Sequence, residues 1–500
     1  MYKPAIAFFM VVALCIMGQT ALAKTDGSMQ ITNIHRIITH QQGWLNTSRP
    51  LTAEDLKGRI ILLDFWTYCC INCMHVIPDL GYLENKFGNK LTVIGVHSAK
   101  FKNEQDSENI RQAILRYGVH HPVVNDFDFS TWKAMGIRAW PTFVLINPQG
   151  TIEATYSGEG HREDLDKAIT ALIQKYGQKY GDKINTTPLP IALETDKQPA
   201  NALSFPSKLA TDGEHLFVAD SGHQRIVIMT LGGKITGIIG SGKTGHDDGV
   251  FATASFNTPQ GLAYKDGLLY IADTNNNMLR VADLRVQKVT TLQSKLSSPW
   301  DVTFYPDSTH LVIAMAGTHQ LGSYDANAKT ITLIAGNGHE SIDDGKYPDN
   351  SLSQPSGLSA AGDTLYFVDA ETSSLREFKN GEVHTLIGTG LFDFGYAEGK
   401  RGTALMQHPL GVFADKDVVY IADAYNHSIR VFDPRTGVLS NFIGHSVRGN
   451  KDGAFAEAEL NEPNDVLEIG NTLYIADTNN NVIRVADLTS KKISTLAISK

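Results

Sequence analysis

Cysteine is scarce in this chain, and its scarcity limits where thiol chemistry can occur. Among 500 residues there are only four cysteines: Cys15 near the start, and Cys69, Cys70 and Cys73 within one five-residue segment. A chain stabilised by structural disulfides spreads its cysteines in pairs along its length. The sequence therefore excludes a disulfide scaffold and confines redox chemistry to the segment around residue 70.

Basic clusters and long apolar runs are also missing beyond the first residues. The net charge is −9, which argues against a polyanion-binding surface, so no nucleic-acid partner is expected. One apolar run, Ala5 to Met17, follows Lys3 and precedes Ala21-Leu22-Ala23, a pattern typical of a secretory signal peptide over residues 1–23. We expect an exported, periplasmic protein with no transmembrane segment in its mature chain; an uncleaved anchor is the alternative.

The three clustered cysteines belong to Cys69-Cys70-Ile71-Asn72-Cys73, which directly follows the apolar run Ile60 to Trp66. Cys70 and Cys73 are thus predicted at a strand-to-helix junction, where the N–H groups of a helix favour a thiolate. Their spacing lets one sulfur reach the other, so the pair can open and close a disulfide. The alternatives are a static disulfide and a zinc half-site, although the chain has no second cysteine pair to complete the latter.

Residues farther along the chain connect this motif to a known family. Asp64 lies six residues before Cys70, Pro78 lies five after Cys73, and Trp140-Pro141-Thr142 precedes another β-rich run. These segments resemble the thioredoxin superfamily, in particular its TlpA-like or DipZ-like branch. The resemblance implies that Cys70 is the attacking thiol and Cys73 the resolving thiol. It also implies that Asp64 is a buried acid assisting proton transfer and that Pro141 is a cis proline beside the disulfide.

Four further residues near the motif are open to two interpretations. Trp66 and Trp140 are expected to form apolar walls beside the disulfide, or else to be ordinary core residues. Cys69 is a packed bystander, because free cysteine packs as a small hydrophobe, or a third thiol that traps mixed disulfides. His75, one turn into the predicted helix, is expected to be exposed rather than catalytic.

Residues 31–176 alternate short β-rich runs with helical patterns, as expected for an α/β domain. Strands are predicted over Leu91–His97 and Phe143–Ile146, and helices over Glu104–Tyr117 and Glu163–Tyr176. Residues 177–200 are polar and contain two prolines, and they are predicted to form a linker.

Residues 201–500 repeat themselves six times. Each repeat contains a proline before a short strand and a second strand that usually ends in Ala-Asp; the prolines are Pro206, Pro259, Pro299, Pro355, Pro409 and Pro463. Six four-stranded units predict a β-propeller, because each unit buries its faces only against its neighbours. The repeats resemble NHL repeats. The predicted fold is therefore multi-domain, an α/β thioredoxin-like domain followed by an all-β six-bladed propeller, and the whole chain resembles the thioredoxin-domain NHL-repeat proteins.

Charged pairs recur inside the repeats. An aspartate ends the second strand, and in four repeats an arginine follows seven residues later: Asp273 and Arg280, Asp369 and Arg376, Asp423 and Arg430, Asp477 and Arg484. We interpret these aspartates, together with Asp220, as turn caps and structural partners; calcium binding is the alternative. Repeat three has neither residue, which makes its His319 and Gln320 candidates for binding a partner, with sequence drift as the alternative.

These features together predict an exported thiol–disulfide oxidoreductase that needs no cofactor and no metal. Its expected partners are a protein thiol or disulfide substrate or a membrane electron donor, with the propeller as the platform that binds protein or substrate. Two alternatives remain from the sequence: a redox-sensitive interaction scaffold whose propeller is the main functional part, and, more weakly, a thiol peroxidase.

Overall fold

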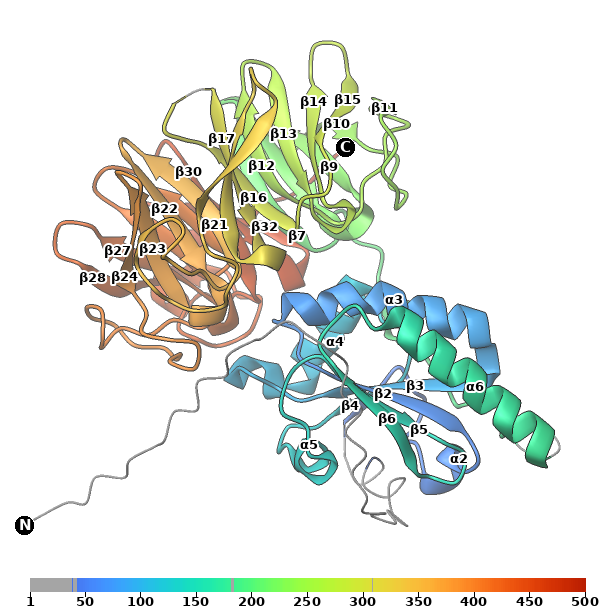
Figure 1. Ribbon diagram of the computed structural model, residues 1–500. Helices are drawn as coiled ribbons and strands as arrows, with labels where there is room; N and C mark the ends of the chain where they lie inside the picture. Colours follow the sequence, from blue (N-terminus) through green and yellow to red (C-terminus); the bar gives the residue numbers. More distant parts are fainter. Residues whose placement is uncertain (1–37, 39–42, 181–183, 308) are drawn as a thin grey trace, which may run out of the picture.

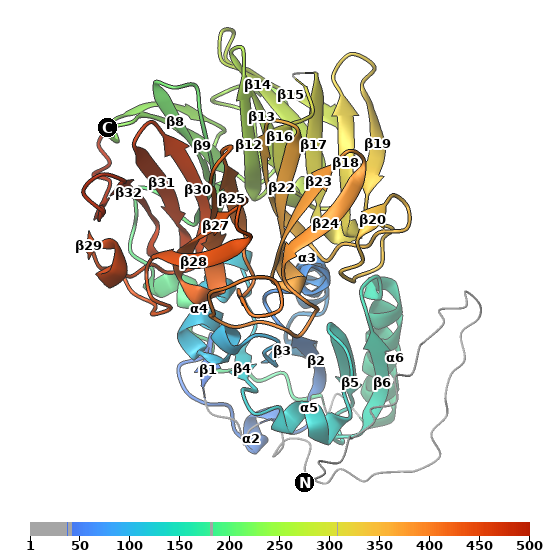
Figure 2. The same cartoon turned by 90° about the vertical axis from the view of Figure 1, so that its left-hand side faces the viewer.

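The computed structural model describes residue 38 and residues 43–180, 184–307 and 309–500. The predicted signal peptide and Cys15 lie outside the described residues. The described chain forms an N-terminal α/β domain and a C-terminal six-bladed propeller that rest against each other (Figures 1 and 2). The predicted fold class is confirmed.

A six-stranded sheet in the order β1-β4-β3-β2-β5-β6 forms the centre of the N-terminal domain. Its strands are β1 (Trp44–Leu45), β2 (Ile60–Trp66), β3 (Leu91–His97), β4 (Val123–Asn125), β5 (Thr142–Ile146) and β6 (Ile152–Ser157). Strands β2 and β3 are parallel and buried at every residue, which explains their unbroken apolar character. The two strands predicted from the sequence are both present.

Helices cover this sheet: α2 (Ala53–Leu56), α3 (Ile71–Phe87), α4 (Ser107–Tyr117), α5 (Ser130–Met135) and α6 (Arg162–Tyr180). Two of them differ from prediction. Helix α4 begins later than expected, because Asp106 caps it by accepting the Glu108 N–H and a 3-10 helix precedes it over Lys102–Gln105. Helix α6 continues through the first four residues of the predicted linker, since Gly177 costs a helix only about 1 kcal/mol.

The remaining part of the predicted linker is docked on the N-terminal domain. Ala192 donates its N–H to the Asn46 carbonyl at 3.1 Å, and Glu194 donates its N–H to the Asn46 side chain at 2.9 Å. Ile191 forms an isolated bridge with Thr47. This segment therefore extends the N-terminal domain toward the propeller.

The propeller consists of six antiparallel sheets arranged around a central channel, and each sheet runs outward from its first strand. Blade one comprises β7 (Pro206–Thr211), β8 (His215–Asp220), β9 (Arg225–Thr230) and β10 (Ile235–Ile239). Blade two comprises β12 (Pro259–Lys265), β13 (Leu268–Asp273), β14 (Met278–Asp283) and β15 (Lys288–Gln293). Blade three comprises β16 (Pro299–Phe304), β17 (His310–Met315), β18 (Gln320–Asp325) and β19 (Thr330–Ala335). Blade four comprises β21 (Pro355–Ala361), β22 (Thr364–Asp369), β23 (Ser374–Lys379) and β24 (Glu382–Ile387). Blade five comprises β25 (Gly411–Ala414), β26 (Val419–Asp423), β27 (Ser428–Asp433) and β28 (Val438–Ile443). Blade six comprises β30 (Pro463–Ile469), β31 (Thr472–Asp477), β32 (Val482–Asp487) and β33 (Lys492–Thr495).

Three blades carry a short fifth strand on their outer edge: β11 (Gly249–Val250), β20 (Gly345–Lys346) and β29 (Gly453–Ala454). The chain end closes the ring on blade one. Ile235 donates its N–H to the Ser499 carbonyl at 2.8 Å, and Ser499 donates its own N–H to Gly233 at 3.0 Å.

The recurring Asp–Arg pairs are buried inside the blades, as the structural interpretation predicts. In blade two, Arg280 Nη1 lies 2.8 Å from Asp273 Oδ2, and neither side chain is exposed to solvent. Asp273 Oδ1 also accepts the N–H of Asn257, so the pair fixes the loop that enters the blade. The same pairing occurs in blades four, five and six at 3.0, 3.0 and 2.9 Å. In blade one, Asp220 pairs instead with Arg225, at 2.7 Å.

A second repeated contact joins each blade to the next. In blade three, His319 Nδ1 accepts the backbone N–H of Gln354, the residue that precedes the first proline of blade four, at 3.0 Å. Equivalent bonds join Gln224 to Thr258, Asn277 to Ser298, Ser373 to His408, His427 to Glu462 and Asn481 to Phe205. Both residues of every pair have left-handed backbone, with φ between 43° and 67°. We call the second residue of each pair the pre-proline position.

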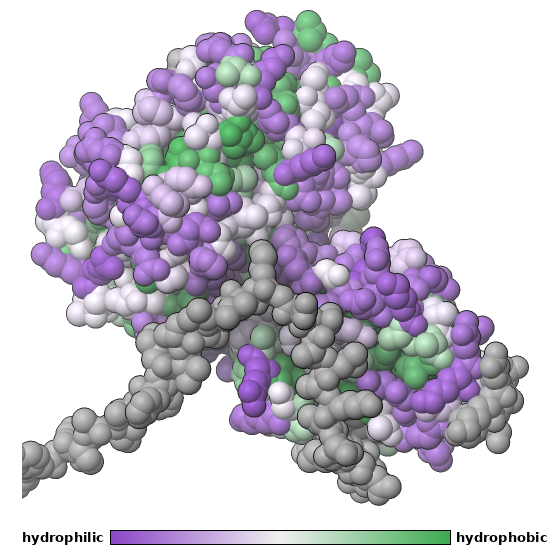
Figure 3. All heavy atoms as spheres, in the orientation of Figure 1, coloured by the Kyte–Doolittle hydropathy of each residue, from purple (hydrophilic) through white to green (hydrophobic). Residues whose placement is uncertain are grey.

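A buried cluster of charged side chains lies in the centre of the propeller. Lys208, only 1% exposed, donates to the Leu410 carbonyl at 2.5 Å and lies 3.5 and 3.8 Å from the carboxylates of Asp301 and Asp465. A cavity of about 410 Å³ adjoins this cluster and is lined by residues of the inner strands of all six blades. Its lining combines apolar residues such as Leu262, Phe304 and Val412 with polar ones such as Thr211, Thr303 and Ser359. Figure 3 shows apolar side chains gathered over the middle of the propeller, on the side that faces the viewer. The centre of the propeller therefore holds a buried cluster of charged side chains and, next to it, a cavity.

Candidate functional site

The Cys-x-x-Cys pair lies at the predicted strand-to-helix junction. Strand β2 ends at Trp66, and Cys70 is the N-cap residue of α3. The Cys70 carbonyl accepts the N–H groups of Cys73 and Met74 at 3.0 and 3.1 Å. Cys70 is half-buried and Cys73 is buried, so Cys70 is the more accessible residue of the pair and Cys73 lies one turn behind it.

Burial controls the second thiol of the pair. It raises the pKa of Cys73 well above the ordinary thiol value, and a hydrogen bond with Cys70 raises that pKa further. The negative charge of Asp64 acts in the same direction. Cys73 therefore keeps its proton until a neighbouring base removes it.

Asp64 is the predicted proton acceptor, and the structure places it in the buried strand β2. Only 2% of the residue is exposed, and its Oδ1 has no hydrogen-bond partner among the described residues. Burial raises the pKa of Asp64 to about 7, although the charge of His121 opposes the shift. A carboxyl group with this pKa can take and return a proton near neutral pH.

The predicted cis proline is present, and two tryptophans pack in the apolar cluster that contains Cys73. The Trp140–Pro141 bond is cis, and the Pro141 carbonyl accepts the N–H of Gly158 at 2.8 Å. Trp66 belongs to the same apolar cluster as Cys73, and Trp140 packs against that cluster. Both interpretations of the tryptophans, apolar walls of the disulfide and ordinary core residues, are compatible with this packing.

Cys69 is fully buried behind the motif. Its N–H donates to Glu104 Oε1 at 2.9 Å, and its sulfur lies 3.8 Å from the Thr67 hydroxyl. Burial raises the pKa of the Cys69 thiol well above its usual value, and the charges of Glu104 and Glu371 add to the shift. An inaccessible, protonated thiol favours the packed-bystander interpretation over a third exchanging thiol.

The propeller covers the motif through residues that sequence reasoning missed. Gln354 Nε2 donates to the Cys69 carbonyl at 3.0 Å, and Gln354 Oε1 accepts the Ile71 N–H at 3.0 Å. Glu462 accepts the hydroxyl of Tyr68 at 3.0 Å and pairs with Arg116 at 3.1 Å.

A buried ion pair joins the domains beside Cys69. Lys100 of the N-terminal domain binds Glu371 of blade four, and both side chains are less than 8% exposed. Burial lowers the pKa of Lys100, but the charges of Glu371 and its other acidic neighbours, together with the hydrogen bond to Glu371, outweigh that effect and leave the pKa raised. Lys100 therefore stays charged and secures the contact across the range of neutral pH.

The pre-proline positions of four successive blades form the docking surface. Ser298 bonds to His75, Gln354 to the motif, and Glu462 to Tyr68, while the ring of His408 packs 5.2 Å from that of Phe101. The sequence carried one signal for this surface: the residue before the repeated proline differs in every repeat, being Phe, Thr, Ser, Gln, His and Glu in turn.

Blade three breaks the repeat pattern at the point where it meets α3. Ala316 packs in a small cluster with Ile71 and Trp300. A Cβ added at Gly317 would lie 2.9 Å from the His75 ring, so this approach requires glycine. The irregular turn therefore makes room for α3.

The two candidate binding residues of blade three differ in their positions. His319 supports Gln354 through the blade-to-blade bond and is one step removed from the motif. Gln320 donates to the Gly336 carbonyl within its own blade.

The predicted exposure of His75 is wrong. Its side chain is 28% exposed, with Nδ1 2.7 Å from Glu159 and Nε2 2.7 Å from the Ser298 hydroxyl. The reason is that the propeller covers the face of α3 on which His75 lies, and no local sequence pattern reports such a contact.

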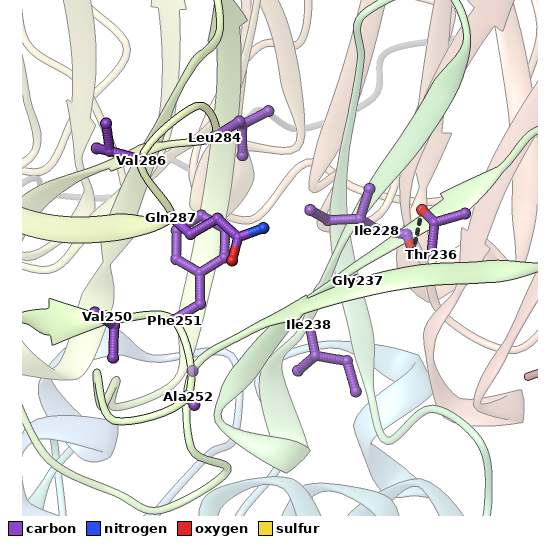
Figure 4. Close-up of a pocket in the computed structure, with 11 residues that line it drawn as sticks. Ile228, Thr236, Gly237, Ile238, Val250, Phe251, Ala252, Leu284, Val286 and Gln287 are labelled. Atoms are coloured by element: carbon purple, nitrogen blue, oxygen red, sulfur yellow. Dashed lines mark hydrogen bonds between the residues drawn. The ribbon is translucent and has the colours of Figure 1, made fainter.

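Two surface cavities differ in their relation to the motif. A cavity of about 400 Å³ runs beside α3 between the domains, lined among others by Met74, Pro78, Asn275 and Trp300. Another, of about 580 Å³, lies between blades one and two and is lined by Ile238, Phe251 and nine further residues of the propeller (Figure 4). The first cavity is lined by Met74, the residue next to Cys73, whereas the second is lined by propeller residues alone; neither is lined by a predicted site residue.

No group of three or more His, Cys, Asp or Glu side chains in the part of the chain that the structure describes could hold a metal ion. No helix within the described residues is long and apolar enough to cross a bilayer.

Comparison with known proteins agrees with this architecture. Residues 58–152 match the family model described as thioredoxin-like, and residues 256–281 match that of the NHL repeat. Human NHL repeat-containing protein 2 is 39% identical over 95% of this chain and 73% of its own length. The Arabidopsis thaliana chloroplastic protein SUPPRESSOR OF QUENCHING 1 is 43% identical over 89% of this chain, which spans about half (46%) of that relative.

The N-terminal domain also has bacterial relatives of its own. Protein DipZ of Mycobacterium tuberculosis is 33% identical over 29% of this chain and 22% of its own length. More distant relatives, 22% and 28% identical, are named thiol-disulfide oxidoreductases.

Fold and motif together define a protein with a thioredoxin-like domain joined to an NHL-repeat propeller. The chain belongs to the family of thioredoxin-domain NHL-repeat proteins that includes NHL repeat-containing protein 2. Its thioredoxin-like domain supports a redox function.

Proposed function

We propose that this protein is an exported thiol–disulfide oxidoreductase that works through Cys70 and Cys73. The observation that carries the proposal is the graded burial of three groups. Cys70 is half-buried at the helix N-terminus, Cys73 is buried one turn behind it, and the acid Asp64 is buried as well. Export rests on the signal-like pattern of residues 1–23, and a periplasm would keep such chemistry in an oxidising setting.

The exchange needs no cofactor. The Cys70 thiolate attacks one sulfur of a substrate disulfide, the substrate S–S bond breaks, and a mixed disulfide forms as one substrate thiolate leaves and takes a proton. Asp64 then removes the proton of Cys73, whose sulfur attacks that of Cys70. The Cys70–Cys73 disulfide forms, and the second substrate thiol departs with two electrons transferred in total.

Regeneration runs the same chemistry in reverse. A dithiol donor, such as the thiol pair of a membrane electron donor, reduces the Cys70–Cys73 disulfide and becomes oxidised itself. The propeller, a fold that commonly mediates protein binding, is the proposed platform for the protein substrate or the donor.

Differential alkylation tests this proposal. The purified mature protein is equilibrated in dithiothreitol buffers of graded potential, the free thiols are alkylated, and the masses are measured. We expect a single reversible two-electron transition that disappears in both Cys70→Ser and Cys73→Ser. Cys69→Ser is the matched control, and it should retain the transition.

One observation favours a second candidate function, the redox-sensitive interaction scaffold. Gln354 and Glu462 of the propeller contact the segment around Cys70 directly, so the motif is partly covered by its own chain. A scaffold would keep its protein partner after Cys70→Ser, whereas an oxidoreductase would lose turnover.

A further inference from the structure

Gln354 contacts both peptide groups that flank Cys70. Its amide nitrogen donates to the Cys69 carbonyl and its amide oxygen accepts the Ile71 N–H, each at 3.0 Å. A carbonyl oxygen can only accept and an N–H can only donate, so these two partners fix the orientation of the amide. Gln354 is 1% exposed, which removes competition from water.

The propeller holds this side chain from behind. Gln354 has a φ of 67°, and its backbone N–H donates to His319 Nδ1 at 3.0 Å. The Gln354 carbonyl accepts the Ser356 hydroxyl at 2.8 Å. Blade three and blade four therefore both set the position of the amide.

The bond to Ile71 bears on the chemistry of Cys70. Ile71 provides the first N–H of α3, and the N–H groups of the first turn carry the partial positive charge that stabilises a thiolate at the N-cap. The amide oxygen of Gln354 occupies that N–H and places partial negative charge beside it. Both effects reduce the stabilisation available to a Cys70 thiolate.

We infer that Gln354 is a positioning residue for the Cys70–Cys73 pair, through which the propeller sets the pair's reduction potential. The inference rests on the proposed function. It assigns the propeller a part in the redox chemistry itself, in addition to any binding of partners. The reduced form of the pair is stabilised less when Gln354 is in place, so the native potential is the more reducing one.

The test compares two Gln354 variants and one control variant by equilibration with dithiothreitol. Gln354→Met keeps the length of the side chain but removes both hydrogen bonds, and it should shift the equilibrium about tenfold toward the dithiol, which is about 30 mV upward. Gln354→Glu adds negative charge at the helix N-terminus and should shift it in the opposite direction. The rate of Cys70 alkylation at pH 7 should rise in the first variant and fall in the second.

Gln407→Met is the matched control. Gln407 of blade five also accepts an N–H of the N-terminal domain, that of Asn103 at 3.3 Å, and it contacts no group of the motif. We expect its potential to stay within about twofold of the wild-type equilibrium, because the three hydrogen bonds that are lost, to Asn103, Tyr425 and Asn426, are neutral and none of them joins the Cys69–Cys73 segment.

Outcomes separate this inference from the proposed function. Potentials unchanged in both Gln354 variants, or an equal shift in Gln407→Met, would overturn the inference while leaving the oxidoreductase in place. A wild-type protein without any reversible couple would overturn the proposed function itself. Opposite shifts of the reduction potential in Gln354→Met and Gln354→Glu cannot come from loosening of the interface, because loosening would shift the potential of both variants in the same direction.

Discussion

Arg116 and Glu462 form a buried ion pair across the domain interface, with side chains 3.1 Å apart and exposed by 9% and 0%. Arg116 comes from α4 and Glu462 from the pre-proline position of blade six. Glu462 also accepts bonds from Tyr68 and Asn103. The pair therefore links the domain that carries the cysteines to the blade that closes the propeller.

Removing one partner of this pair should destabilise the protein. Arg116→Ala leaves the Glu462 carboxylate buried without its counter-charge, and we expect a loss of about 3–5 kcal/mol in the free energy of unfolding, measured by urea denaturation. Arg448→Ala is the control, because Arg448 pairs with Asp106 at the partly exposed rim, at 2.9 Å. The control should lose no more than about 1 kcal/mol. Equal losses of unfolding free energy in the two variants would show that the buried pair contributes no more to stability than the exposed one.

Asp64→Asn should change both stability and exchange. The folded pKa of Asp64 is about 7, whereas an unfolded aspartate titrates near about 4, so folding takes up a proton between these values. Stability contributed by the protonated carboxyl is complete below pH 4 and is lost as pH rises through 7.

Asparagine mimics the neutral acid, so Asp64→Asn should be more stable than wild type at pH 8 and equal to it near pH 4. Without the base, resolution by Cys73 should slow about 10- to 100-fold at pH 7. Urea denaturation at the two pH values and stopped-flow exchange measure these effects. A variant that is less stable at pH 8 would contradict the buried, uncompensated carboxylate.

Two glycine-to-alanine substitutions should have opposite effects on stability, one weakening the domain interface and the other strengthening α3. Gly317→Ala would place its Cβ 2.5 Å from the Ser297 hydroxyl and 2.9 Å from the His75 ring, and we expect docking of the domains to weaken. Gly81→Ala in α3 meets nothing within 4 Å and should stabilise the helix by about 0.5–1 kcal/mol. Limited proteolysis of residues 184–200 reports docking. Faster cleavage in Gly317→Ala alone is the expected result, and equal cleavage in both variants would contradict it.

Cys69 should react far more slowly than Cys70. It is fully buried, and its raised pKa leaves little thiolate at pH 7. We expect iodoacetamide to label Cys70 of the reduced native protein at least about 100-fold faster, as measured by peptide mass spectrometry. Comparable labelling of both residues would restore the interpretation of Cys69 as a third exchanging thiol.

Local pattern was sufficient for much of the fold and for the motif. Strand β3 has the predicted bounds Leu91–His97, the six blades follow the spacing of the repeated prolines, and Cys70 caps α3 at the predicted junction. Each of these features depends on residues close together in the chain or on a strict repeat.

The domain interface could not be predicted in this way. Gln354 lies 283 residues from Ile71 along the chain, and neither residue carries a pattern that indicates the other. The exposure of His75 cannot be predicted from local sequence for the same reason, since it depends on Ser298 of a distant blade. The irregular turn of blade three was visible in the sequence, but its cause, the approach of α3, emerged only from the packing.

The reduction potential of the Cys70–Cys73 pair in the purified mature protein tests the central claim most directly. We expect one reversible two-electron couple, lost in Cys70→Ser. A value near about −270 mV would indicate a reductase supplied by an electron donor, and one near about −120 mV an oxidant that donates disulfides. The absence of any reversible couple would contradict the account and leave the scaffold interpretation in its place.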